Sequence, residues 1–244
     1  MIFQQQIPYD VHAPRPLPGI APLAAEPWFL VDDAYAKQMA QRRDLIANRH
    51  SEVIQTETPS KVATREMFAD ILANLPPGFA IEDGTVRCPD GQRVALNTDA
   101  PFETLGGILQ EDICLLEKRG DEHVLSGAVL CFPASWRLQE KIGHPLTHIH
   151  EPVLDYTPEI AKRVQRLFDG VRAGRPIWRF NALWYEDPTL FQPRSASEPR
   201  PLTEAGHTPY LRSERQVIWR LPKSNAVLFT IHTFVVKSPG RVTP

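Results

Sequence analysis

The first third of the chain begins with a proline-rich stretch, which is followed by two segments with apolar residues at helical spacing. Prolines are frequent in Pro8–Pro27, so this stretch cannot be a helix and is expected to lie as an extended arm over the body. The pair Asp32-Asp33 is typical of a helix N-cap, and the apolar residues up to Ile46 lie loosely at helical spacing. A second helix is predicted over Thr64–Leu75, because a Pro-Pro-Gly sequence ends its apolar stripe.

Shorter runs of apolar residues follow and favour strands. Two Asp-Gly turn signals within Phe79–Leu96 predict a small strand pair. A short helix is predicted over Phe102–Leu109. Two β-like runs, Ile113–Lys118 and His123–Phe132, surround a turn that contains Gly120, and together they predict a hairpin.

The second half of the chain begins with helical signals and ends with strand signals. Short helical pieces are expected around Trp136–Ile142. Thr157 followed by Pro158 is a favourable helix start, and the apolar stripe that follows predicts a helix that ends before Gly174. Three β-like segments complete the chain, and a tight turn between the last two predicts an antiparallel hairpin. These segments are Ile177–Tyr185, Gln216–Leu221 and Ala226–Val236.

This order of elements predicts an α+β fold, a five-stranded antiparallel sheet with helices on one face. A hairpin, connecting helices and three further strands is the order of a PAS domain, in which sheet and helices enclose a ligand pocket. Residues 111–240 would form this PAS-like domain. Residues 1–110 would form an N-terminal arm and helical lobe added to it.

Composition narrows the classes of protein. The chain has 244 residues with 42% hydrophobic content, which is enough for one sizeable core. A net charge of -2 disfavours nucleic acid as a partner. No apolar run approaches the roughly 18 residues that span a bilayer, and the N-terminus lacks the features of a signal peptide. The three cysteines form no CxxC pair, so we expect a reducing, cytoplasmic environment.

Three of the eight histidines, His144, His148 and His150, fall within seven residues. Imidazole is the commonest protein ligand for metals near neutral pH. Pro145 and Pro152 prevent the segment from being one regular helix, and in an extended chain His148 and His150 would share a face. The spacing is not a standard zinc signature, so the pattern leaves open both a metal site and surface histidines with ordinary hydrogen bonds.

Polar residues also run into two predicted strands. The residues from Arg212 to Gln216 precede the apolar run Val217–Leu221 and form either the polar wall of a pocket or a solvated loop. In the strand before them, Trp178 lies on the same face as Phe180 and Trp184, and these aromatic residues indicate core or the wall of a flat cofactor pocket. Arg179 and Asn181 lie on the opposite face of that strand.

Several short motifs, in this order, resemble the haem-binding α subunit of the haem-dependent oxidative N-demethylases and related bacterial proteins. The resemblance covers most of the chain from about Trp28 to Val236. The residues that carry it are Trp136-Arg137-Leu138, Glu140-Lys141-Ile142-Gly143, Pro145-Leu146, Ile149-His150, Pro152-Val153, Tyr156, Arg179, Asn181, Glu214-Arg215-Gln216, Arg220-Leu221-Pro222 and Ala226–Ile231.

The resemblance implies a PAS-type domain that holds haem b. It also implies oxidation of a small methylated amine with O₂ and release of formaldehyde, with electrons supplied by partner subunits that carry FMN and a [2Fe–2S] centre. The implied iron ligand is His150, with His148 second and His144 third. The implied polar residues that contact O₂, substrate or a propionate are Arg212, Glu214 and Gln216, and the further implied cofactor contacts are Lys141, Arg137 and Arg179.

The sequence departs from the family pattern at Ala182, Asn225 and His232, where tryptophan, glycine and arginine are common. These departures concern the substrate more than the fold. Two other functions fit the sequence. One is a haem or gas sensor without turnover, and the other is a non-haem metalloprotein in which His144, His148 and His150 bind zinc, iron or nickel.

Overall fold

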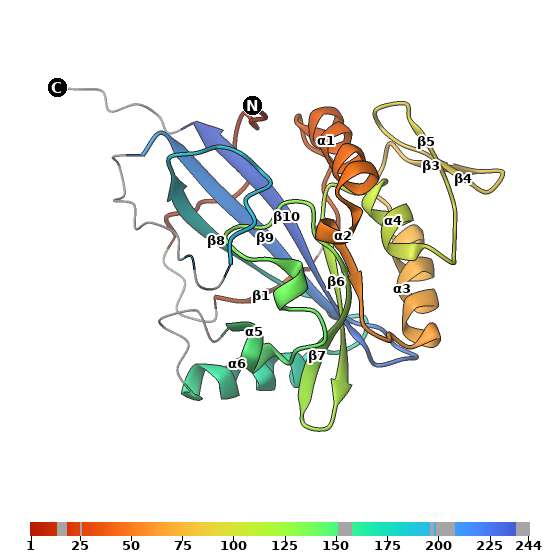
Figure 1. The fold of residues 1–244 in the computed structure, drawn as a ribbon, viewed down its shortest axis with the longest axis vertical. Coiled ribbons are helices and arrows are strands. Elements are labelled where there is room, and N and C mark those ends of the chain that lie inside the picture. The colour runs from red at the N-terminus through yellow and green to blue at the C-terminus, as the bar shows by residue number, and fades with distance from the viewer. Residues whose placement is uncertain (14–18, 25, 151–157, 196–197, 199–207, 238–244) are drawn as a thin grey trace.

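The fold is known from a computed structural model, which describes residues 1–13, 19–24, 26–150, 158–195, 198 and 208–237. Within these ranges the main element is a seven-stranded antiparallel sheet with the order β1-β8-β9-β10-β6-β7-β2 (Figure 1). Its strands are β1 (Ala21–Pro22), β2 (Ile54–Thr56), β6 (Asp112–Arg119), β7 (Glu122–Val129), β8 (Ile177–Tyr185), β9 (Tyr210–Arg220) and β10 (Val227–Lys237).

A smaller three-stranded sheet lies apart from the main one (Figure 1). It consists of β3 (Ala80–Glu82), β4 (Thr85–Arg87) and β5 (Arg93–Ala95). The helices are α1 (Tyr35–Asn48), α2 (His50–Val53), α3 (Lys61–Ala73), α4 (Pro101–Gly106), the 3₁₀-helix η1 (Leu138–Glu140), α5 (Leu146–His150) and α6 (Pro158–Gly170).

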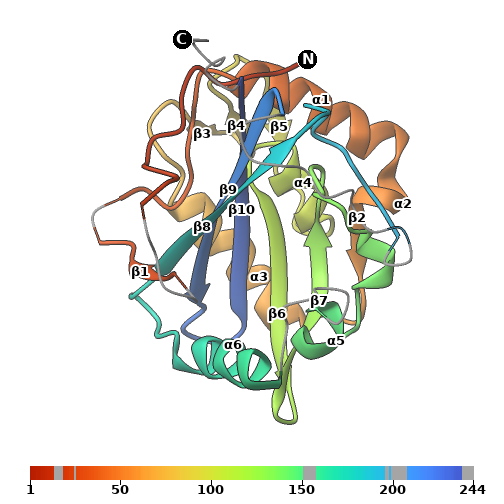
Figure 2. The same cartoon turned by 90° about the vertical axis from the view of Figure 1, so that its left-hand side faces the viewer.

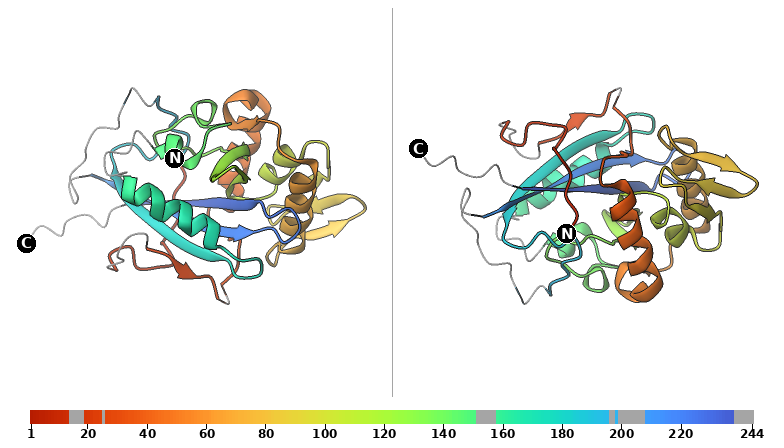
Figure 3. Two further views of the ribbon diagram at one scale, coloured as in Figure 1. Left: turned by 90° about the horizontal axis from the view of Figure 1, so that it is seen from below. Right: turned by 90° about the horizontal axis from the view of Figure 1, so that it is seen from above.

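The main sheet buries both of its faces. Along β6, Ile113 and Leu115 belong to the apolar cluster that contains α1, α3 and α4, whereas Cys114 and Leu116 belong to the cluster that contains α5 and α6. Successive side chains of a strand point to opposite faces, so these two sets of helices cover opposite faces of the sheet. Figures 2 and 3 show α6 crossing one end of the strands, with the N-terminal arm on the other side of the sheet.

The five predicted strands form the centre of the sheet, but the expectation of five strands in all was wrong. Strands β1 and β2, from the N-terminal part of the chain, extend its two edges. They have two and three residues, too few for an alternating pattern to show in the sequence. The expectation of helices on one face holds for α5 and α6 alone, because α1, α3 and α4 cover the other face.

The largest error in a boundary concerns β9, which begins at Tyr210 rather than at Gln216. The residues between these two positions pair with both β8 and β10, so they are strand and not a solvated loop. Four of the five residues from Arg212 to Gln216 are buried. Because most of their side chains are polar, this segment lacks the apolar pattern by which a strand is predicted from a sequence.

The N-terminal arm was predicted correctly. Tyr9 stacks on Phe180 with ring centroids 4.6 Å apart, and it also contacts Trp178 and Phe234. The expected N-cap at Asp32-Asp33 was wrong, because α1 begins at Tyr35 and its N-cap is Ala34, which makes no side-chain cap bond. Asp32 Oδ1 instead accepts a hydrogen bond from the backbone N–H of Ala34 at 2.9 Å, in the turn before the helix.

Two other N-terminal elements differ from the prediction. Helix α3 begins at Lys61, three residues earlier than expected, because Ser60 Oγ accepts a hydrogen bond from the backbone N–H of Ala63 and caps the helix. The region Phe79–Leu96 forms three strands rather than a pair, because each of its two turns reverses the chain.

Cys88, Cys114 and Cys131 are free thiols, and all three are buried. Among the described residues, the longest helices are too short and too polar to cross a lipid bilayer. The proposed boundary near residue 110 stays a prediction. Residues from both sides of it, such as Met39 and Trp219, belong to the same apolar cluster.

Candidate functional site

The polar side chains of β8 and β9 meet on the face of the sheet that α5 and α6 cover. Arg212, Glu214 and Gln216 alternate along β9, so they share this face. The register of the two strands places Asn181 opposite Glu214 and Arg179 opposite Gln216. We call these five residues the β8–β9 polar cluster. The sequence predicted all of them as motif or site residues, and the sheet brings them together.

Glu214 is the centre of this cluster and is only 9% exposed. Its Oε2 accepts hydrogen bonds from Asn181 Nδ2 at 3.0 Å and from Gln216 Nε2 at 3.4 Å. Its Oε1 lies 3.7 Å from Arg212 Nη2. The backbone N–H of Glu214 also donates to Asn181 Oδ1 at 3.2 Å. The amides therefore fix the orientation of a carboxylate that is almost removed from water.

Arg212 is 2% exposed, and its guanidinium mainly contacts the backbone. Nη1 donates to the carbonyl oxygen of Leu190 at 3.1 Å, and Nη2 donates to that of Phe132 at 2.6 Å. The guanidinium carbon lies 5.8 Å from the centre of the Tyr185 ring. These contacts hold the segment after β8 against the segment after β7, so Arg212 forms one wall of the cluster.

Arg179 is half-buried and has no hydrogen-bond or ion-pair partner among the described residues, and its Nε is fully buried. Burial lowers the pKa of Arg179, and the charge of Glu214 opposes that effect in part. A buried guanidinium nitrogen without an acceptor is costly, so this position favours an acceptor from a bound molecule.

Thr233 is a member of this face that sequence reasoning missed. It lies on β10 directly opposite Glu214, is buried, and its Oγ1 has no partner among the described residues. The period of two along the last strand would have placed Thr233 on the same face as Ile231. Only the register between β9 and β10 shows that this face continues the polar cluster.

The histidine segment forms a short helix rather than an extended strand. Helix α5 spans Leu146–His150, so the extended conformation in which His148 and His150 would share a face does not occur. Instead, His144 and His148 lie one turn apart, with ring centroids separated by 4.1 Å, and both are exposed. The backbone of His150 belongs to α5, and its side chain lies outside the described atoms.

Two basic residues of the predicted site lie near this segment. Lys141 is buried, and its Nζ donates to the carbonyl oxygen of Ile149 at 2.8 Å, one residue before His150. Arg137 is exposed and lies 3.8 Å from Glu198. A role for either residue at a propionate stays a prediction. Across the described ranges, no group of three or more His, Cys, Asp or Glu side chains is placed to hold a metal ion.

Helix α5 and the polar cluster lie on the same side of the sheet. Ile149 packs against the apolar cluster that contains Ile218 and Ile231, and Ile231 is the β10 neighbour of Gln216. The polar cluster therefore belongs to the antiparallel sheet of an α+β protein and lies on the same face as these apolar residues and helices. The model of the family described as haem-dependent oxidative N-demethylase, alpha subunit-like, matches residues 19–238. The chain therefore belongs to this family.

Proposed function

We propose that this chain is the haem-binding subunit of a haem-dependent oxidative N-demethylase, with its site on the β8–β9 polar cluster. The family description supports haem dependence, the demethylase class and membership of a complex with other subunits. The observation that carries the location is Arg179, a half-buried cation with no protein partner among the described residues, beside the buried carboxylate of Glu214.

The residues on this face fit haem b. A haem requires an apolar surface, cations for its propionates and an axial ligand. Ile218 and Ile231 supply buried apolar surface, and Arg179 supplies an unused guanidinium. His150 would supply the axial imidazole from the end of α5, on the same side of the sheet. The two strands before α5, the helices and the three strands after them support a PAS-like arrangement of this domain.

When bound, the haem supplies the redox chemistry that oxidises a C–H bond next to nitrogen with O₂. The residues of this chain position the reactants. The carboxylate of Glu214 attracts the ammonium of a small methylated amine, and Asn181 and Gln216 hold that carboxylate in a fixed orientation. Burial strengthens the attraction because it removes competing water. Partner subunits with FMN and a [2Fe–2S] centre would supply the electrons.

The axial ligand is tested by absorbance spectra of the chain expressed with a haem precursor. We expect a Soret band in the wild type and a shifted or lost band in His150→Ala. His148→Ala is the matched control, since His148 is an exposed residue of the same helix, and its spectrum should match the wild type. An unchanged spectrum of His150→Ala would remove this ligand assignment, and stoichiometric metal without a Soret band would favour a non-haem site.

The roles of the polar cluster are separated by two further variants. Arg179→Met should weaken haem binding about tenfold or more, and Arg179→Lys should restore part of it, because an ammonium also attracts a propionate. Glu214→Gln should keep the Soret band and lose the spectral change caused by dimethylamine. Amine-dependent O₂ uptake with reductase subunits then distinguishes an enzyme from a sensor, and its complete absence in the reconstituted complex would favour the sensor.

A further inference from the structure

Helix α6 and the turn after it carry an unusual concentration of positive charge. Between residues 162 and 175 the sequence has five basic residues and a single acidic one. All five basic side chains are exposed. We call them the α6 basic surface, and they are Lys162, Arg163, Arg166, Arg172 and Arg175. The whole chain has a net charge of -2, so this positive charge is local.

No carboxylate of the described residues neutralises this surface. The one acidic residue among them, Asp169, accepts a hydrogen bond from Lys118 Nζ at 2.6 Å, on the neighbouring β6. None of the five basic residues forms an ion pair within the described ranges, and Arg166 donates only to the backbone carbonyl of Lys162. Lys162 and Arg166 are four residues apart on α6, a spacing at which like charges destabilise a helix unless a partner neutralises them.

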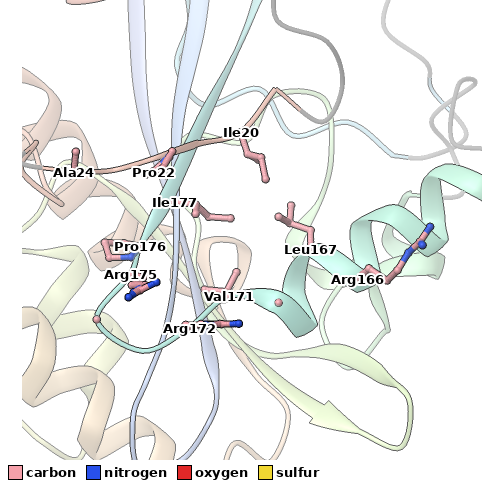
Figure 4. Close-up of a pocket in the computed structure, with 12 residues that line it drawn as sticks. Ile20, Pro22, Ala24, Arg166, Leu167, Val171, Arg172, Arg175, Pro176 and Ile177 are labelled. Atoms are coloured by element: carbon pink, nitrogen blue, oxygen red, sulfur yellow. The ribbon is translucent and has the colours of Figure 1, made fainter.

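A hollow of about 600 Å³ opens beside this surface, between the end of α6, the start of β8 and β1 (Figure 4). Its apolar lining is formed by Ile20, Pro22, Leu167, Val171 and Ile177. In Figure 4, Leu167, Val171, Ile177 and Ile20 surround the open space, whereas Arg166, Arg172 and Arg175 lie around its margin. The site thus combines an apolar floor with a cationic margin.

The floor and the margin are held rigidly. Arg220 of β9 donates from Nη2 to the carbonyl oxygen of Phe168 at 2.6 Å and from Nε to that of Val171 at 2.7 Å. These bonds fix the C-terminal end of α6 to the sheet. On the other side of the hollow, Pro22 pairs with Ile177 where β1 joins β8. A preformed surface loses little entropy when it binds a partner.

We propose that the α6 basic surface and its hollow are the docking site for the acidic surface of a partner protein, which places one apolar side chain on the floor. This inference rests on the proposed function, in which the chain is one subunit of a complex. Charge complementarity selects the partner, because carboxylates of an incoming protein would neutralise arginines that no described residue pairs with. Arginine is also enriched at protein interfaces.

A protein fits the site better than a nucleic acid does. The positive charge is confined to one helix and its following turn, whereas a nucleic acid requires a longer basic track, and the rest of the chain carries a net negative charge. A phosphate backbone also has no apolar group that could pack on the floor of the hollow. An apolar residue surrounded by carboxylates matches both parts of the site.

The test uses a plant-type [2Fe–2S] ferredoxin, a small acidic protein, as the probe, and calorimetry measures its binding to the full chain. We expect binding at 50 mM NaCl that weakens about tenfold at 300 mM NaCl. The variant Arg166→Glu/Arg172→Glu/Arg175→Glu should weaken binding about tenfold or more at 50 mM NaCl. Ile20→Gln should weaken it a few-fold, because it removes part of the apolar floor.

A charge-matched control changes three exposed basic residues elsewhere, Lys61→Glu/Arg65→Glu/Arg87→Glu, and should leave binding within about twofold of the wild type. Absence of ferredoxin binding, or equal losses in both triple variants, would overturn the proposal. Tighter binding of a DNA duplex or of phosphatidylserine vesicles would also overturn it. The Soret band of each variant is recorded separately, so a missing haem identifies failure of the proposed function, and a normal haem without ferredoxin binding identifies failure of the docking site.

Discussion

His232 illustrates how a single side chain acquires a charge from its surroundings. Its Nδ1 lies 3.0 Å from Glu111 Oε1, and its Nε2 lies 3.0 Å from Asp32 Oδ2. An ionised carboxylate can only accept hydrogen bonds, so the ring donates from both nitrogens and is an imidazolium. Only the tertiary structure shows that this histidine of the last strand joins the N-terminal segment to the sheet.

The protonation of His232 predicts a pH-dependent stability. Burial alone would lower the pKa of His232, but the charges and hydrogen bonds of Glu111 and Asp32 raise it to about 9. Because the folded-state pKa is raised, protonated His232 contributes its full stabilisation of the folded state below the unfolded-state pKa of roughly 6.5. This stabilisation is lost as the pH rises toward 9. We expect the free energy of unfolding in urea to fall by on the order of 3 kcal/mol across this range.

The variant His232→Gln is the comparison for this effect. It should be less stable than the wild type at pH 6, and its stability should change much less between pH 6.5 and 9. The pKa of Asp32 moves in the opposite direction, since His232 lowers it to about 2 against the effect of burial. The stabilisation that ionised Asp32 provides therefore persists down to acid pH. If the unfolding free energies of the wild type and His232→Gln changed equally with pH above roughly 6.5, the assignment to His232 would be contradicted.

At the scale of elements, close packing determines how β7 and α4 meet. Gly127 lies in the middle of β7, and a Cβ atom there would come within about 2.6 Å of the buried Phe102 ring of α4. The backbone of β7 can approach α4 only because this residue has no side chain.

Gly127→Ala is therefore expected to destabilise the protein by about 1–3 kcal/mol, since either the ring or the strand must move. Urea unfolding measures this change. Gly170→Ala, at the end of α6, is the control, because a Cβ atom there meets nothing within 4 Å. Its unfolding midpoint should equal or slightly exceed that of the wild type, and a similar loss in both variants would show that packing against Phe102 is not the cause.

A second prediction at this scale concerns the position of α5. Lys141 Nζ contacts the carbonyl oxygen of Ile149 near the C-terminus of this short helix, where a positive charge is favourable. Lys141→Met keeps the length of the side chain and removes the donor. We expect a loss of about 1–3 kcal/mol in stability and weaker haem binding, with a Soret position like that of the wild type.

The outcome for Lys141→Met separates a positioning residue from an axial ligand. A ligand change moves the Soret maximum, whereas a displaced helix lowers haem affinity at an unchanged maximum. Lys141→Arg should recover part of the affinity, since it keeps the positive charge. If Lys141→Met binds haem as tightly as the wild type, Lys141 does not position the segment that carries His150.

At the scale of the whole molecule, one buried ion pair joins the N-terminal helices to the main sheet. Arg42 of α1 donates from Nη1 to Asp112 Oδ1 at 2.6 Å, and both side chains are fully buried. Asp112 also accepts from the backbone N–H groups of Cys131 and Phe132, at 2.7 and 3.0 Å. The pair therefore fixes α1, the start of β6 and the segment after β7 to one another.

Removing Arg42 would leave the buried carboxylate of Asp112 with its two backbone hydrogen bonds but without its counter-charge. We expect Arg42→Met to lower the free energy of unfolding by about 3–5 kcal/mol, measured in urea. Arg49→Ala breaks the exposed Arg49–Glu52 pair and should cost less than about 1 kcal/mol. Similar losses in the two variants would show that burial does not set the energy of the inner pair.

The sequence was sufficient to predict elements that carry a continuous apolar run or a one-sided apolar stripe. The centre of the sheet was predicted because strands buried on both faces have apolar runs, and α6 was predicted because its apolar residues repeat at the helical period. The members of the β8–β9 polar cluster were also named from the sequence, as motif residues. Their roles toward a ligand stay predictions, since no local pattern in the sequence shows which groups Arg179 and Glu214 contact.

The tertiary structure decided which of these residues meet and what each one contacts. Register across three strands placed Asn181, Glu214 and Thr233 side by side, although more than 50 residues separate the first of them from the last. In the folded chain the guanidinium of Arg212 donates to two backbone carbonyl oxygens, whereas that of Arg179 has no partner among the described residues. Local periodicity specifies the face on which a side chain lies, whereas its neighbours depend on contacts between distant segments, which no local pattern records.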